Sequence, residues 1–271
     1  HVRIRPTFSG GPGEQFDGAQ LSFNRQYILD HVSIAWGVDE PLDAYSAQHI
    51  TVQYSTIEEG AMNGHPEGAH NYGAINGPDG HHSTFHHNLF VHEENRNPAV
   101  ANGPCEVIGN VAYNVRHGFV HHNPASGPFN IIGNSYIRGG DDDLFPFFFD
   151  DESGFSAPDL RYFLADNFIE DPGIFTGVVN DPWSEQVHPS FDDLYAPADR
   201  RSPTVHDFAA EPGYVPTVVE SPADAYANVV ACAGAFPRDV VTRRMISELE
   251  ERSGSWGVDA PADLLEGLVP G

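Results

Sequence analysis

The chain has 271 residues, with 13 Lys plus Arg against 39 Asp plus Glu, and its formal net charge is −26. This charge excludes a conventional nucleic-acid-binding protein, which needs a basic face to neutralise phosphates, and no apolar run approaches the roughly 20 residues of a membrane-spanning helix. Because 40% of the residues are hydrophobic, the chain can bury a sizeable core. We therefore expect a folded protein that binds neither nucleic acid nor membranes.

All 13 basic residues are arginines. An acidic excess without lysine is typical of a protein adapted to concentrated salt, where a Debye length of about 3 Å at 1 M makes self-repulsion tolerable. The alternative, a GC-rich genome that replaces Lys by Arg, does not explain 39 acids. We therefore expect halophily. Since the chain begins at His1 within strand-like sequence, we also expect it to lack a leader and some N-terminal coils.

Short apolar segments separated by Gly and Pro recur along the first two thirds of the chain, and six of them share one pattern. They read "ILDHVSI", "TVQYSTI", "TFHHNLF", "VIGNVAY", "IIGNSYI" and "FLADNFI". A period in the low twenties, lengthened by inserted loops, predicts a parallel β-solenoid. An antiparallel sandwich is the alternative, but its hairpins would recur every 8–12 residues or so. The matching positions, at steps of 23, 34, 22, 24 and 33 residues, are His31, Tyr54, Asn88, Asn110, Asn134 and Asn167.

The asparagines at this position predict a ladder of side-chain amides that bond to one another along the solenoid axis. After Asn167 the repeat fades into residues 170–204, which are rich in Pro, Asp and aromatic side chains. We interpret this segment as a long ordered excursion along the solenoid wall. The predicted organisation is one solenoid domain, residues 1–271, on which the loops and the C-terminal helix of residues 170–271 pack.

One helix is predicted near the end of the chain. It should run from Pro237 or Arg238 to about Glu251, with Asp239 as a plausible N-cap. Apolar residues at i, i+4 and i+8 fall on one face of this helix, so we expect it to serve packing rather than chemistry. These residues are Val241, Met245 and Leu249.

Three acids lie where consecutive coils would stack: Asp17 in "QFDGAQL", and Asp39 and Asp43 in "VDEPLDAY", with Glu40 beside them. Hard cations such as Ca²⁺ bind several carboxylate oxygens at about 2.3–2.6 Å, and a rigid wall can supply such a cluster. Chance clustering is the alternative in a chain with 39 acids.

Histidines form a second constellation, since eleven of the 15 lie between His49 and His122. Imidazoles could ligate Zn²⁺ or act as general bases near neutral pH. No H-E-x-x-H helix or zinc-finger spacing occurs, so the spacing favours turn and wall histidines that bond to the backbone over a zinc site.

Other polar groups allow several interpretations. Arg96 in "HEENRNPAV" can form a salt bridge with its acidic neighbours or bind an anion. The acids of residues 141–143 and 150–151 could pair as glycosidase carboxylates, but solvated acidic loops are the stronger interpretation. Cys105 and Cys232, the only cysteines, neither establish nor exclude a disulfide.

Five segments together resemble the pectate lyases: "ILDHVSIAWGVDE", "ITVQYSTIEEG", "HPEGAHNYGAI", "FHHNLFVHEENRNP" and "AGAFPRDVVTRRMISELEERSG". The resemblance extends from about Val2 to Gly254. It implies a right-handed parallel β-helix and a secreted enzyme that cleaves an acidic polysaccharide such as pectate by β-elimination with Ca²⁺.

The resemblance also implies roles for single residues. Asp17, Asp39 and Asp43 match the calcium-binding carboxylates, and Arg96, in an Arg-x-Pro motif, matches the catalytic arginine that removes the C5 proton of a galacturonate. In that mechanism Ca²⁺ bridges the substrate carboxylate and acidifies this proton, and the glycosidic oxygen leaves from C4. Substrate binding is expected of three neighbours, His65, His70 and Asn97.

Two positions depart from the family pattern. Glu67 stands where the family usually has Lys, and Ala99 stands where a second Arg often follows the Pro. The chain therefore lacks two cations that would contact substrate carboxylates. Glu67 could instead join the metal site or act as a catalytic base or acid on a less charged polymer. The remaining alternatives are a catalytically degenerate carbohydrate-binding β-helix and a polygalacturonase-like hydrolase.

Overall fold

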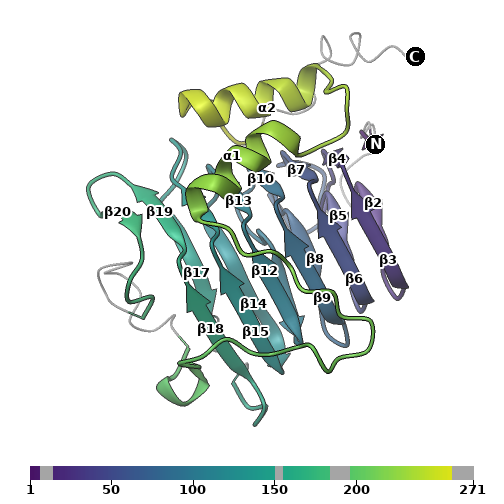
Figure 1. Ribbon diagram of the computed structural model, residues 1–271. Helices are drawn as coiled ribbons and strands as arrows, with labels where there is room; N and C mark the ends of the chain where they lie inside the picture. Colours follow the sequence, from purple (N-terminus) through teal and green to yellow (C-terminus); the bar gives the residue numbers. More distant parts are fainter. Residues whose placement is uncertain (7–14, 150–154, 184–195, 258–271) are drawn as a thin grey trace.

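The computed structural model describes residues 1–6, 15–149, 155–183 and 196–257. Short strands dominate, and two α-helices follow them near the C-terminus (Figure 1). The strands are β1 (Val2–Ile4), β2 (Ala19–Gln20), β3 (Arg25–Asp30), β4 (Val32–Ala35), β5 (Leu42–Asp43), β6 (Gln48–Gln53), β7 (Thr56–Glu58), β8 (Ala74–Asn76), β9 (His81–His86), β10 (Leu89–Val91), β11 (Ala99–Asn102), β12 (Cys105–Ile108), β13 (Val111–Tyr113), β14 (His117–Ser126), β15 (Pro128–Ile132), β16 (Ser135–Ile137), β17 (Phe145–Phe149), β18 (Arg161–Ala165), β19 (Phe168–Asp171) and β20 (Phe175–Val178). The helices are η2 (Ala198–Arg200, a 3₁₀ turn), α1 (Pro222–Cys232) and α2 (Val240–Glu251).

Each turn of the chain adds one strand to each of three sheets. The strand orders are β1-β4-β7-β10-β13-β16-β19-β20, β2-β5-β8-β11-β14-β17 and β3-β6-β9-β12-β15-β18. Every pairing within these sheets is parallel except that between β19 and β20, which is antiparallel. This topology confirms the right-handed parallel β-helix and excludes the sandwich.

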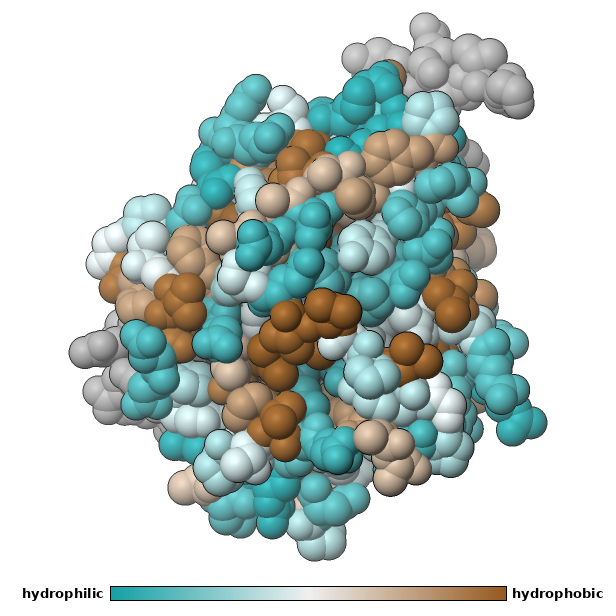
Figure 2. Space-filling view, viewed as in Figure 1, coloured by the Kyte–Doolittle hydropathy of each residue, from teal (hydrophilic) through white to brown (hydrophobic). Residues whose placement is uncertain are grey.

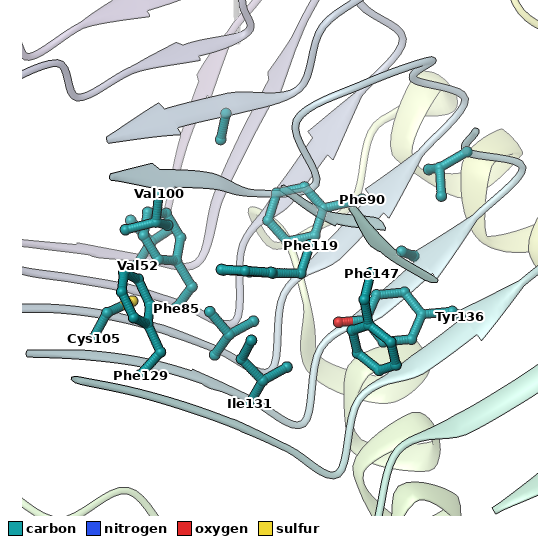
Figure 3. Close-up of a cluster of buried hydrophobic side chains, with 14 of the residues drawn as sticks. Val52, Phe85, Phe90, Val100, Cys105, Phe119, Phe129, Ile131, Tyr136 and Phe147 are labelled. Carbon is teal, nitrogen blue, oxygen red and sulfur yellow. The ribbon is translucent and has the colours of Figure 1, made fainter. Parts of the chain in front are cut away.

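The interior of the coil is filled by stacked apolar side chains. Strands such as β6 and β9 alternate buried and half-buried residues, because successive side chains point to opposite faces of a sheet. Large aromatic rings from neighbouring coils gather in the middle of the solenoid (Figure 3). Phe129, fully buried, stacks on Tyr162 with ring centroids 4.9 Å apart.

The asparagine ladder is confirmed for four coils. Asn88, Asn110 and Asn134 each donate from Nδ2 to the Oδ1 of the next asparagine, the last of which is Asn167, at 2.9–3.0 Å. The same amides also donate to backbone carbonyls of the preceding coil at 2.8 Å. Buried polar groups are thus satisfied by one another along the axis.

The alignment of His31 and Tyr54 with the ladder asparagines is wrong by one residue. Both residues lie one position earlier, at a corner where the backbone turns through the left-handed region with φ of 53° and 43°. The ladder position in the second coil is Ser55, whose N–H donates to Asn88 Oδ1 at 3.0 Å and whose hydroxyl accepts from Val32 N at 3.1 Å. A hydroxyl therefore continues the ladder where the asparagine is absent.

Helices α1 and α2 cover the outer face of the eight-stranded sheet (Figure 1). Helix α2 begins at Val240, slightly later than predicted, and the Asp239 carboxylate accepts from Thr242 N at 2.9 Å, which confirms this N-cap. Helix α1 was not predicted. Its signal is the capping residue Ser221 followed by Pro at the first helical position. The predicted apolar face of α2 is buried, together with one residue of α1 and its C-cap: Val241, Met245 and Leu249 of α2, Val229 of α1, and Ala233.

Residues 202–221, which we name the strap, cross the outer face of the sheet that contains β9, β12 and β15 before they enter α1 (Figure 1). Tyr214 donates to Glu106 at 2.7 Å, and Asn130 exchanges hydrogen bonds with the backbone of His206. On this face of the molecule hydrophilic residues separate the apolar patches (Figure 2).

Cys105 is buried in the core, Cys232 ends α1, and both are free thiols. Among the helices of the described ranges, none has the length and apolar character needed to cross a bilayer.

Candidate active site

The residues that precede β2, β5, β8 and β11 form one row along an edge of their sheet. Ala19 pairs with Leu42, Leu42 with Ala74, and Ile75 with Ala99. Counting back two residues from the first two pairs brings Asp17, Glu40 and Tyr72 into equivalent positions of successive coils. Tyr72 bridges Asn95, so Arg96 lies one residue further along the next coil. In order along the axis the four polar residues are Asp17, Glu40, Tyr72 and Arg96.

Carboxylates crowd the first half of this row. Oxygen atoms of Asp17, Asp39 and Glu40 all lie within 4.8 Å of one another. Burial and the nearby charge of Asp43 raise the pKa of Asp17 to about 7. Burial raises the pKa of Glu40 to about 8, although Arg96 opposes the shift. Without a metal ion Asp17 and Glu40 therefore hold part of their protons near neutral pH, and the group fits a hard divalent cation that would replace those protons.

Asp43 lies beside this group, and its carboxyl contacts that of Asp17. Its carboxylate accepts from Ser22 Oγ, from Tyr45 N at 2.6 Å and from Gln20 Nε2 at 3.4 Å. The structure therefore brings Asp17 and Asp39 together with Glu40, and places Asp43 behind Asp17 as a nearby negative charge. The sequence signal for including Glu40 is that it directly follows Asp39. Both residues come just before β5, so this strand holds both at the same edge of the sheet.

Two histidines flank Asp39 on the other side. The rings of His65 and His70 stack with centroids 3.4 Å apart, and their Nε2 atoms lie 3.7 and 3.8 Å from the Asp39 carboxylate. Burial and the neighbouring His65 lower the pKa of His70, so its ring stays neutral and can act as acceptor or ligand. Asp39 thus belongs both to the carboxylate group and to a histidine pair.

Arg96 ends the row of polar residues. Its NH1 donates to Glu40 Oε1, and its guanidinium lies over the ring of Tyr72 at 4.2 Å from the centroid. Both contacts fix the guanidinium at the edge of the acidic group, where a planar cation can bind a carboxylate. Tyr72 was missed from the sequence, because only the pairing of β8 with β11 places it beside Arg96.

The other predicted site residues lie at different depths. Glu67 is exposed, and its backbone N–H donates to His65 Nδ1 at 3.2 Å. Asn97 is 1% exposed, and its amide donates to the carbonyl of His117 at 2.9 Å, which places it behind Arg96 as a support for the turn. Ala99 is fully buried against Ile75 and Val120.

The acidic run considered for a hydrolase is neutralised by neighbours. Asp142 pairs with Arg116 at 3.2 Å and Asp143 with Arg138 at 2.7 Å, while Asp141 accepts from the Asn114 amide at 2.6 Å. Such partners are typical of a structural acidic loop. The second group, residues 150–151, lies outside the described residues.

No protein-family model matches the chain. Curated relatives do match. The probable pectate lyase C of Aspergillus fumigatus is 35% identical over 143 residues, which are 51% of this chain and 32% of that protein. Its counterpart in Aspergillus flavus is 29% identical over 170 residues (61% and 38%), and that of Emericella nidulans is 36% identical over 115 residues (42% and 25%). The chain spans about a third of the length of these relatives. The chain is therefore similar to proteins named as probable pectate lyases over about half of its length, and the parallel β-helix agrees with that similarity.

Proposed function

We propose that the protein is a polysaccharide lyase that cleaves pectate, or a related uronate polymer, by calcium-assisted β-elimination. One observation carries this proposal: three carboxylates, from Asp17, Asp39 and Glu40, converge beside Arg96 on one edge of the β-helix. The names of the curated relatives support the same reaction class.

Asp17, Asp39 and Glu40 would hold the calcium ion, which when bound would neutralise a substrate carboxylate and acidify the adjacent C5 proton. Arg96 would bind the uronate and, as the family resemblance implies, remove this proton. Its guanidinium is charged below a pH of about 12. With calcium bound, Glu40 would be ionised, but the metal ion would offset its charge, so it would stabilise the charged guanidinium less than a free carboxylate does.

A second candidate is a degenerate carbohydrate-binding module. The observations in its favour are that Glu67 stands in place of a cation and that the buried Ala99 offers substrate no charge. A hydrolase remains a further alternative, with saturated products as its signature.

The proposed substrate also bears on the salt concentration at which the enzyme works. A chain with a net charge of −26 repels a polyanionic substrate in dilute buffer, and molar salt or divalent ions would screen that repulsion. We therefore propose a secreted, halophilic enzyme whose residues 1–271 act as one lyase-like domain, with residues 170–271 packed on the solenoid.

The test is the ultraviolet absorbance of unsaturated product released from polygalacturonate and from methylated pectin, at low and molar salt, with Ca²⁺ or with chelator. We expect product that requires Ca²⁺ and is lost by at least a hundredfold in Arg96→Ala. Arg116→Ala is the matched control, because this arginine lies one coil away and pairs with Asp142.

Absence of product from a folded protein that still binds the polymer would favour the binding module. New reducing ends without ultraviolet absorbance would favour the hydrolase. The variant Glu67→Lys tests the role of this glutamate. Faster cleavage of polygalacturonate by the variant would argue against a selected role for Glu67.

A further inference from the structure

Three imidazoles meet at the opposite end of β8 from the acidic row. His49 belongs to β6, and His81 and His82 begin β9, the neighbouring strand in the same sheet (Figure 1). Gln48 pairs with His81 and Ile50 with Ser83, so His49 and His82 are equivalent residues of adjacent coils. Both adopt left-handed backbone, with φ of 54° and 55°, and their rings stack with centroids 4.4 Å apart.

The ring nitrogens of this trio converge. One nitrogen from each ring lies within 4.8 Å of those of the other two, and the Nδ1 atoms of His81 and His82 are 2.5 Å apart. Two imidazole lone pairs at that distance repel unless a proton or a cation lies between them. Burial and the neighbouring rings lower the pKa values of His49 and His81, so both rings are neutral near pH 7 and offer lone pairs.

A carboxylate from the strap orients the third ring. Glu211 Oε2 lies 2.9 Å from His82 Nε2. If Nε2–H donates to this carboxylate, the neutral ring keeps its Nδ1 lone pair directed at His81. A carboxylate that holds the outer nitrogen of an imidazole is the usual second contact of a metal-binding histidine.

A pocket of about 350 Å³ adjoins the trio, lined by His81, His82, Asp79, Asn102, Gly103 and Ser126. The Oδ1 atom of Asn102 is buried without a hydrogen-bond partner. The pocket therefore has room and polar atoms for water as a fourth ligand.

The chain contains a close counterpart that lacks one element of the site. His86 and His87 also approach through their Nδ1 atoms, at 3.0 Å, and His87 Nε2 lies 3.0 Å from a strap carboxylate, Glu220. Here, however, the residue equivalent to His49 is Tyr54, whose ring stacks on His87 at 5.0 Å. Three imidazoles thus converge around His81 and His82, whereas two meet at His86 and His87.

We propose that His49, His81 and His82 bind a divalent transition-metal ion of the zinc class, and that Glu211 links this ion to the strap. Imidazole is a preferred ligand of zinc, at about 2.0–2.1 Å. Tetrahedral geometry then requires nitrogens about 3.3 Å apart, so binding moves the His81 and His82 rings apart by roughly 1 Å. The linear spacing argued against zinc, because one ligand comes from the preceding coil, 32 residues before His81.

The test is titration of the chelator-stripped full chain with ZnCl₂, followed by calorimetry, and with CoCl₂, followed by visible absorbance, both in saturating Ca²⁺ to fill the acidic group. We expect one equivalent of zinc at the trio, with affinity at least tenfold weaker in His49→Ala and in His81→Ala. Glu211→Gln should weaken binding about tenfold. His86→Ala is the matched control and should bind as the wild type does.

Several outcomes would overturn the proposal. One is the absence of saturable zinc binding, and another is unchanged affinity in both His49→Ala and His81→Ala. Loss of the zinc in His70→Ala, but not in His81→Ala, would assign it to the Asp39, His65 and His70 group instead. Should one alanine variant fail to fold, Glu211→Gln, which leaves the three rings in place, still decides through its affinity and its cobalt spectrum.

Discussion

Replacement of Glu40 by Gln tests whether this buried carboxyl is protonated in the metal-free fold. The side chain is only 4% exposed and is paired with Arg96, yet burial raises its pKa from 4.5 to about 8. The unfolded chain holds this proton only below pH 4.5, so the folded state binds more protons across the window up to pH 8. Stability must therefore fall as the pH rises through this window.

The size of the effect follows from the shift. At 1.36 kcal/mol per pKa unit, this group alone lowers the free energy of unfolding by at most about 5 kcal/mol between pH 4.5 and pH 8. In Glu40→Gln this loss should vanish, because glutamine does not titrate. Relative to wild type, the variant should thus become more stable at pH 8.5 than at pH 5.

The assay is equilibrium urea unfolding in chelator at the two pH values, with Glu250→Gln, an exposed acid on α2, as the control. Saturating Ca²⁺ should restore wild-type stability at pH 8.5, by about 3 kcal/mol at 100 times its Kd. An equal difference between variant and wild type at both pH values would refute the reasoning. It would mean that the Arg96 ion pair keeps Glu40 ionised throughout.

Three further substitutions test the asparagine ladder, the packing of the core and the N-cap of α2. Asn110→Ala removes the amide that donates to Phe85 O and to Asn134, and it should lower the free energy of unfolding, measured by thermal unfolding, by about 3 kcal/mol or more. A decrease below about 1 kcal/mol would show that the ladder contributes little to stability. Phe129→Ala, in the core, should cost about 3–5 kcal/mol by urea unfolding, unless the coil collapses around the site. Although burial opposes ionisation, Arg5 lowers the pKa of Asp239, so Asp239→Ala should cost about 1–2 kcal/mol at pH 7. This difference from wild type should fade as the pH falls through the lowered pKa, and a difference that persists in strong acid would contradict the ionic contribution.

The sequence predicted those features that repeat along the chain. The period placed Asn88, Asn110, Asn134 and Asn167 on one ladder, and all four lie there. It misplaced His31 and Tyr54, because a single left-handed residue at each corner shifts the alignment by one position. Linear pattern alone could not show this shift, since Gly, His, Tyr and Asp all occur at that corner.

Residues that meet through lateral pairing of coils were harder to predict. Asp17 and Asp39 were recognised, but the partnership of Glu40 with Arg96 depends on the register between β5, β8 and β11. The meeting of His49 with His82 has the same origin. Loop length between coils varies, so sequence distance does not report which residues become neighbours in a solenoid.

The antiparallel strand β20 has a consequence for assembly. A parallel β-helix ends in unpaired strand edges that can dock onto another molecule's coil. Here β20 covers the last strand of the largest sheet, β19, and reverses the chain direction there. A second copy therefore cannot continue that sheet in parallel register at this end. Because this protection is built from paired backbone, it persists at the salt concentrations that remove charge repulsion.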